Sequence, residues 1–279
     1  MNTLAFSATI AGASFCAGFL GSLTGLGGGF IITPVLTLVF GADIRYAIGA
    51  SLISIIATSS GAAAAYVKEG FTNLRVGMLL EIATVLGALV GASLVTVFPA
   101  RGITIAFGTV LLVSAYLTTR PHAEHLTAGL APDPLASRLR LDSSYPTSDG
   151  SLRYRVRNVP GGFALMWIAG VLSGLLGIGS GAVKVLAMDR VMYLPFKVST
   201  ATSNFMIGVT AAASAGIYLR HGFVDPGLAM PVMLGVLAGS VVGARLLFGA
   251  NTARLRLLFA VALVAVAAEM IYKGAAGGR

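Results

Sequence analysis

Apolar residues gather in ten runs along the chain, separated by short polar stretches and by one long one. The runs fall in two sets of five, at about 4–22, 29–41, 46–66, 75–98 and 101–117, and again at about 162–176, 181–195, 198–219, 227–248 and 252–272. Crossing a bilayer takes a helix of about 20 apolar residues, and the second run of each set is short for that. The pattern predicts an all-α polytopic membrane protein with four to five membrane segments in each set.

Composition supports this prediction and removes other classes. Hydrophobic residues make up 56% of the 279 residues and charged residues only 10%, whereas soluble domains carry about 25% charge. A cytosolic enzyme and a secreted scaffold are therefore excluded. The formal net charge of +9 does not indicate a nucleic-acid partner, because the basic residues lie between apolar runs, as in the short cytoplasmic loops of membrane proteins.

The long polar stretch, residues 118–161, divides the chain. It contains several prolines and ten of the 29 charged side chains, a composition typical of a poorly ordered linker outside the lipid. Its six arginines place it in the cytoplasm by the positive-inside rule. We therefore expect a membrane repeat at 1–117, a polar cytoplasmic linker at 118–161 and a second membrane repeat at 162–279.

The two membrane segments are copies of one another. A shift of 152 residues superimposes the two sets of runs and pairs Gly18, Gly25, Gly27, Gly29, Ser51 and Tyr66 with Gly170, Gly177, Gly179, Gly181, Ser203 and Tyr218. Duplicated membrane halves are typical of secondary transporters, whose site lies between the repeats near the bilayer midplane. An odd number of crossings in each half would make the repeats inverted, and this is the arrangement that we expect.

Each half contains a glycine-rich stretch that disfavours a continuous helix. Residues 21–31 read GSLTGLGGGFI and residues 173–183 read SGLLGIGSGAV. Glycines at alternate positions favour an unwound backbone, which a membrane tolerates only where it is buried or lines a watery cavity. Two such breaks at equivalent places indicate a transporter site, whose free amides attract an anion. The candidates for substrate binding are Gly27, Gly28, Gly29, Gly179, Ser180 and Gly181. The alternative is that these glycines serve close helix packing.

Two other glycine pairs have a different setting. Gly87 and Gly91, like Gly239 and Gly243, form GxxxG spacings inside uninterrupted apolar runs. This spacing lets two helix backbones approach closely, so we expect these glycines to pack helices.

Two charged residues interrupt apolar runs. Lys184 follows the second glycine stretch, where the first half has Ile32, and Glu81 lies within MLLEIATVL. An ionisable group at membrane depth is a functional candidate. Lys184 would bind an anionic substrate, unless it extends to the interface instead. Glu81 is a candidate for proton coupling, with a structural hydrogen bond between helices as the alternative.

Hydroxyl and amide side chains open the third run of each half. Ser51 in the first half, with Ser203 and Asn204 in the second, can present donors to oxyanion oxygens. Hydroxyls also bond to their own helix, so the amide of Asn204 is the stronger candidate. Catalytic and metal-ligating patterns are absent from the sequence: the only cysteine is Cys16, and the three histidines lie in loops. We expect neither an enzyme nor a cofactor.

Together, the repeat and the two glycine stretches resemble the TauE/SafE sulfite exporter family, also called the toluene sulfonate uptake permease family. The resemblance is carried by GFLGSLTGLGGGFIITPVL at 18–36, GVLSGLLGIGSGAV at 170–183 and KVSTATSNF at 197–205. It implies a multi-pass carrier in the cell inner membrane for small sulfur-containing anions such as sulfite, sulfoacetate or other organosulfonates.

The direction of transport follows partly from physics. A potential that is negative inside favours outward movement of an anion by about 2.3 kcal/mol per charge per 100 mV, so export by alternating access needs no coupling ion. The alternatives are proton-coupled uptake of a sulfonate or another small organic anion, and a membrane subunit that transports nothing itself.

Overall fold

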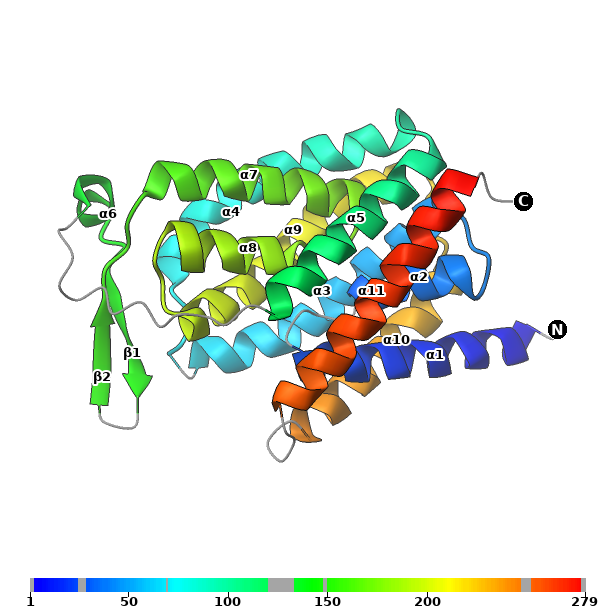
Figure 1. Cartoon of the computed structure of the whole chain (residues 1–279), viewed down its shortest axis with the longest axis horizontal. Coiled ribbons are helices and arrows are strands. Elements are labelled where there is room, and N and C mark those ends of the chain that lie inside the picture. The colour runs from blue at the N-terminus through cyan, green and yellow to red at the C-terminus, as the bar shows by residue number, and fades with distance from the viewer. Residues whose placement is uncertain are drawn as a thin grey trace.

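The computed structural model consists almost entirely of helices. It describes residues 3–24, 29–68, 70–119, 133–147, 150–246 and 252–276. The first half contains α1 (Thr3–Thr24), α2 (Gly29–Leu38), α3 (Ile44–Lys68), α4 (Leu74–Ser93), the 3-10 turn η1 (Leu94–Thr96) and α5 (Ala100–Thr119). The second half contains α7 (Val159–Leu176), α8 (Gly181–Leu186), the π-helical turn η3 (Ala187–Val191), α9 (Phe196–Arg220), α10 (Pro226–Leu246) and α11 (Thr252–Ala276). Several long helices, such as α1 and α7, lie roughly along the long axis of the molecule, whereas α5 and α11 are inclined to it (Figure 1).

Four helices of the first half begin at positions that correspond to helix starts in the second half. The bounds of α9 are those of α3 shifted by 152 residues. The pairs α2 and α8, α4 and α10, and α5 and α11 also begin 152 residues apart. The register that superimposes the two halves of the sequence therefore also superimposes the starts of these helices.

In each half, the first long helix and the short helix that follows it fold back on one another. The ring of Phe6, near the start of α1, lies 6.0 Å from the ring of Phe40, just beyond α2. In the second half, the backbone N–H of Arg157, before α7, donates to the carbonyl of Met192, after η3, at 3.1 Å. Each pair therefore returns to the end of the molecule at which it starts, and α1 starts at the end opposite to α7 (Figure 1).

The fourth helix of each half packs against the other half. Helix α4 packs on α7 and α9, and α10 packs on α1 and α3, while α5 and α11 pack together. A Cβ atom at Gly87 would lie 2.2 Å from the carbonyl oxygen of Trp167, and one at Gly91 2.0 Å from that of Val171. At Gly239 the distance to the carbonyl of Phe15 would be 2.0 Å. The packing role predicted for these three glycines is confirmed, and the surroundings of Gly243 lie outside the described residues.

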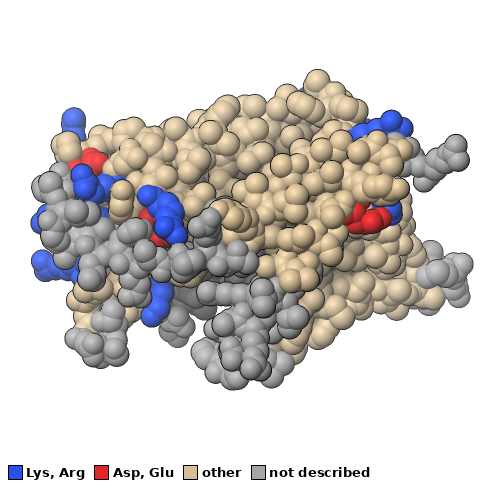
Figure 2. All heavy atoms as spheres, viewed as in Figure 1, with Lys and Arg blue, Asp and Glu red and all other residues tan. Residues whose placement is uncertain are grey.

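Apolar side chains cover the outside of the helices between two charged ends. On α4, Met78, Ile82 and Leu86 are exposed and lie four residues apart, which places them on one face. Figure 2 shows Lys, Arg, Asp and Glu gathered toward the two ends of the visible face, with uncharged atoms between them. Among the described residues, Leu74–Thr96 and Val159–Leu176 are long and apolar enough to span a membrane. These features agree with the expected class of an all-α membrane protein.

Part of the linker is folded, so the expectation of a poorly ordered segment is wrong for residues 133–147 and 150–158. The short helix α6 (Pro134–Arg138) precedes an antiparallel hairpin of β1 (Ser143–Thr147) and β2 (Gly150–Tyr154). Buried side chains of this folded part of the linker belong to one apolar cluster with side chains of α4 and η3. The cluster includes Ala136, Leu141, Tyr145, Tyr154, Val156, Val76, Leu80 and Met188. This burial orders a segment whose composition alone is that of a loop. Residues 120–132 lie outside the described residues.

Asn73 fastens this hairpin to the membrane helices. Its side-chain oxygen caps α4 by accepting from the Val76 N–H at 3.1 Å. Its side-chain amide donates to the Leu141 carbonyl at 2.9 Å and to the Tyr154 hydroxyl at 2.8 Å. The backbone N–H of Asn73 donates to the hydroxyl of Thr202 on α9 at 3.0 Å. One buried residue thus connects the linker, the start of α4 and α9.

Candidate functional site

The second glycine-rich stretch has irregular backbone in the middle of the molecule. Helix α7 ends at Leu176 and α8 begins at Gly181. Between them, Gly177, Gly179 and Ser180 have φ values of 63°, 66° and 47°. Glycine adopts this left-handed conformation at little cost, whereas a residue with a side chain loses about 1–2 kcal/mol there. Ser180 is therefore held in a strained conformation, and it is buried.

Ser51 joins the glycine stretches of the two halves. It is buried on α3, and its Oγ lies 3.1 Å from the carbonyl oxygen of Gly177 and 3.4 Å from that of Gly29, the first residue of α2. The matching residue in the second half, Ser203 on α9, lies 3.4 Å from the carbonyl oxygen of Gly181. The structure thus brings Gly29, Gly177 and Ser51 together, although they come from opposite halves of the chain.

The remaining predicted site residues in the described part of the chain are Gly179, Gly181 and Asn204, and all three lie on or beside α9. Gly179 and Gly181 both lie close to Ile207 of α9. Asn204 is half-buried on the same helix. Gly27 and Gly28 fall outside the described residues.

Lys184 and Glu81, the two charges that interrupt apolar runs, meet at one hydroxyl. The ammonium of Lys184 on α8 donates to the Oγ1 of Thr210 on α9 at 2.6 Å. The same oxygen lies 2.7 Å from Oε1 of Glu81 on α4. Lys184 and Thr210 are fully buried, and Glu81 is 8% exposed. Lys184 therefore does not extend to the interface, and its charge is held inside the protein opposite that of Glu81.

The hydroxyl of Thr210 has one hydrogen and several neighbours that can accept it. Besides Glu81, the carbonyl of Met206 lies 3.0 Å away and the hydroxyl of Thr84 3.5 Å away. Because one hydrogen makes one strong bond, Thr210 can donate to Glu81 or to Met206 while it accepts from Lys184. Within the described part of the chain, Oε2 of Glu81 and Oγ of Ser180 are buried and have no hydrogen-bond partner. These two buried oxygen atoms can therefore form hydrogen bonds that the described residues do not provide.

Two residues of this cluster were not predicted as site residues. Thr210 is one of several hydroxyls on its helix, and Thr84 follows Glu81 by one helical turn. The repeat offers a partial signal for Thr210, since it pairs with Thr58 at the shift of 152 residues. Nothing in the sequence places either hydroxyl beside Lys184.

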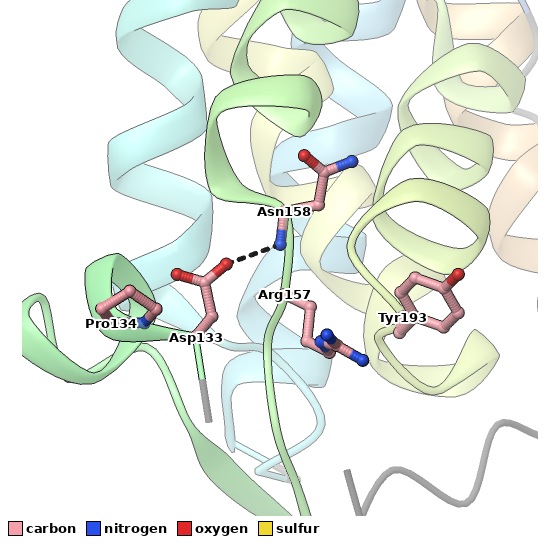
Figure 3. Close-up of a pocket in the computed structure, with 5 residues that line it drawn as sticks. All are labelled: Asp133, Pro134, Arg157, Asn158 and Tyr193. Carbon is pink, nitrogen blue, oxygen red and sulfur yellow. Dashed lines mark hydrogen bonds between the residues drawn. The ribbon is translucent and has the colours of Figure 1, made fainter. Parts of the chain in front are cut away.

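A second candidate location lies on the linker. A pocket of about 420 Å³ is lined by Asp133, Pro134, Arg157, Asn158 and Tyr193 (Figure 3). The carboxylate of Asp133 accepts from the backbone N–H groups of Leu135, Ala136 and Asn158. Burial would raise the pKa of Asp133, but these donors outweigh it and hold the pKa below its ordinary value. Asp133 is therefore occupied in fastening the linker to the start of α7.

The arrangement of metal-ligating side chain types can be checked in the described residues. Over the residues that the structure describes, no group of three or more His, Cys, Asp or Glu side chains is close enough to hold a metal ion. The central cluster offers hydroxyls, one ammonium and one carboxylate, which suit the binding of a small polar ion.

Comparisons with known proteins agree with these features. The profile of the family described as sulfite exporter TauE/SafE matches residues 10–270. The chain is 28% identical over 267 residues to "Probable membrane transporter protein YunE" of Bacillus subtilis (strain 168), covering 92% of this chain and 94% of the relative. It is 28% identical over 232 residues to YdhB of the same strain, which bears the same description, covering 83% and 86%.

Another bacterium also has a similar protein. A "Probable membrane transporter protein" of Xylella fastidiosa (strain 9a5c) is 25% identical over 270 residues, covering 94% of each chain. No solved structure matches the chain. The chain therefore belongs to the sulfite exporter TauE/SafE family, which makes it a multi-pass membrane transporter and not an enzyme.

Proposed function

We propose that this protein carries small sulfur-containing anions, such as sulfite, sulfoacetate or other organosulfonates, across the cell inner membrane by alternating access. The observation that carries the proposal is the contact of Ser51 with both Gly29 and Gly177. It joins the first residue of α2 to Gly177, which lies in the irregular backbone before α8 and its buried Lys184. Irregular backbone inside a membrane is tolerated where it lines a cavity, and broken helices at a repeat interface are typical of transporter sites.

The two halves act as inverted repeats in this proposal. Residues 1–117 form one repeat, 118–161 the linker and 162–279 the other. In each repeat, three helices cross the bilayer. The first long helix and the short helix after it enter the bilayer and return to the side from which they start. The opposite starting ends of α1 and α7 support the inversion (Figure 1). The positive-inside rule supports a cytoplasmic location for that end, because Arg138, Arg140, Arg153 and Arg155 lie on or beside the hairpin.

Each predicted site residue has a proposed role. Lys184 supplies the positive charge, which acts strongly at low local dielectric. The hydroxyl of Ser180 and the amide of Asn204 donate to the oxygens of the anion, and Ser51 and Ser203 position the glycine stretches. Backbone amides of Gly27, Gly28, Gly29, Gly179 and Gly181 complete the set of donors. Export is the net direction that we propose.

A flux measurement with the purified protein tests this function. In proteoliposomes we expect sulfite, sulfoacetate or methanesulfonate to move at least tenfold faster than in protein-free vesicles, with chloride and taurine much slower. Selective movement of an anion without sulfur would contradict the proposed substrate class. If no anion moved, the chain would instead be a membrane subunit that transports nothing by itself.

A further inference from the structure

The buried charges form a closed network between the two halves. Glu81 lies on α4 of the first half, whereas Lys184 and Thr210 lie on α8 and α9 of the second. Both charges contact one hydroxyl oxygen, so each partly neutralises the other. Together, the carboxylate of Glu81 and the ammonium of Lys184 carry no net charge.

The described elements that pack around Glu81 and Lys184 carry few other ionisable groups. Helix α7, which packs against α4, has no charged residue over Val159–Leu176. On α9 the charged residues, Lys197 and Arg220, lie at the two ends of the helix. Asp189 of η3 pairs with Arg190 at 3.5 Å. Lys184 is therefore the cation that faces Glu81 from the helices packed around it.

We propose that Glu81 binds one proton each time Lys184 binds one negative charge of the substrate. This inference rests on the proposed function, since it concerns the same site. An anion that bonds to the ammonium of Lys184 takes over the charge that balances Glu81. The site would then hold two negative charges and one positive charge away from water, which is strongly unfavourable. Uptake of one proton by Glu81 restores neutrality.

The carboxylate has a free position for that proton. Oε1 of Glu81 accepts from Thr210, whereas Oε2 is buried without a partner among the described residues. The proton comes from water on the side where the anion enters, binds at Oε2, and returns to water where the anion leaves. When Glu81 becomes neutral, the hydroxyl of Thr210 can turn to the carbonyl of Met206, 3.0 Å away. No bond other than these O–H and N–H contacts changes.

Proton uptake changes what drives transport. A neutral loaded site moves through the membrane without sensing the potential, so the flux follows the gradients of the anion and of protons. Export then requires the product of the anion and proton concentrations to be higher inside the cell than outside, and an acidic exterior drives uptake. The potential acts only on a carrier that moves net charge.

The test counts protons and anions together in proteoliposomes of the full chain. Methanesulfonate is the main probe because it is fully ionised and carries no proton itself; sulfite serves as a second probe, corrected for its own titration. We expect one proton to move with each methanesulfonate and no dependence of the anion flux on an imposed potential. Anion flux without proton flux would overturn the inference and leave the proposed function intact. Absence of any anion flux would overturn both.

The variant Glu81→Gln separates coupling from transport. We expect it to move methanesulfonate without protons, and the equilibrium anion ratio to become voltage-dependent, by about tenfold per 60 mV for one net charge. Glu269→Gln, at an exposed glutamate on α11, is the matched control and should remain coupled. Proton coupling that persists in Glu81→Gln would overturn the inference. If the variant does not fold, the ratio of protons to anions moved by the unaltered protein still tests the inference.

Discussion

Replacing Lys184 by methionine is expected to reduce anion flux at least a hundredfold and to destabilise the protein. Methionine fills a similar volume but leaves no positive charge for the substrate and none opposite Glu81. Breaking a buried ion pair by removing one partner costs about 3–5 kcal/mol, because the other charge stays buried without compensation. Flux into proteoliposomes and thermal unfolding in detergent measure the two effects.

Two further variants separate these effects. Lys197→Met removes an exposed lysine at the start of α9 and should change neither flux nor unfolding temperature appreciably. The double variant Lys184→Met with Glu81→Gln should recover most of the lost stability, because no uncompensated charge remains, but it should not recover flux. A Lys184→Met protein with normal stability and normal flux would show that Lys184 has no role in the site.

Replacing Gly91 by alanine is expected to cost about 3 kcal/mol of stability, through the contact between α4 and α7. A Cβ atom at Gly91 would lie 2.0 Å from the carbonyl oxygen of Val171 and 2.8 Å from its carbon. Both atoms belong to the backbone, so the helices must separate, and overpacking of this kind costs about 1–3 kcal/mol, occasionally more. Thermal unfolding of the purified protein measures the loss.

Gly12→Ala is the matched control for this contact. Gly12 is also inside a long helix, but a Cβ atom there would meet nothing within 4 Å. Its replacement should be neutral or stabilising by up to about 1 kcal/mol, because alanine favours helices. Equal unfolding temperatures for Gly91→Ala and Gly12→Ala would contradict the close approach of α4 and α7.

Much of the helical arrangement could be predicted from the sequence, because apolar runs and glycine spacing are local signals. The run at 29–41 contains α2, and the run at 198–219 lies within α9. The main difference concerns the linker, which is expected to be poorly ordered but contains a helix and two paired strands. Its folding depends on Tyr145, Tyr154 and Val156 finding an apolar cluster formed by other elements, and composition carries no information about that contact.

The candidate site could be predicted only in parts. Lys184 and Glu81 stand out because charges are rare in apolar runs, but the sequence does not pair them. Their contact depends on α4 packing against the helices of the other half. The 152-residue shift does not reveal this packing between the halves. Thr210 contacts Glu81 only because of that packing, and in the sequence its hydroxyl is one of many on α9.

Substrate binding where the two glycine stretches meet is tested most directly by a cysteine at Ser180. In a Cys16→Ser background, which removes the only native thiol, Ser180→Cys is treated with a thiosulfonate reagent that itself carries a sulfonate group. We predict that modification blocks methanesulfonate flux and that methanesulfonate, but not chloride, slows the modification. Full flux after complete modification, or a thiol that stays unreactive during transport, would contradict the claim.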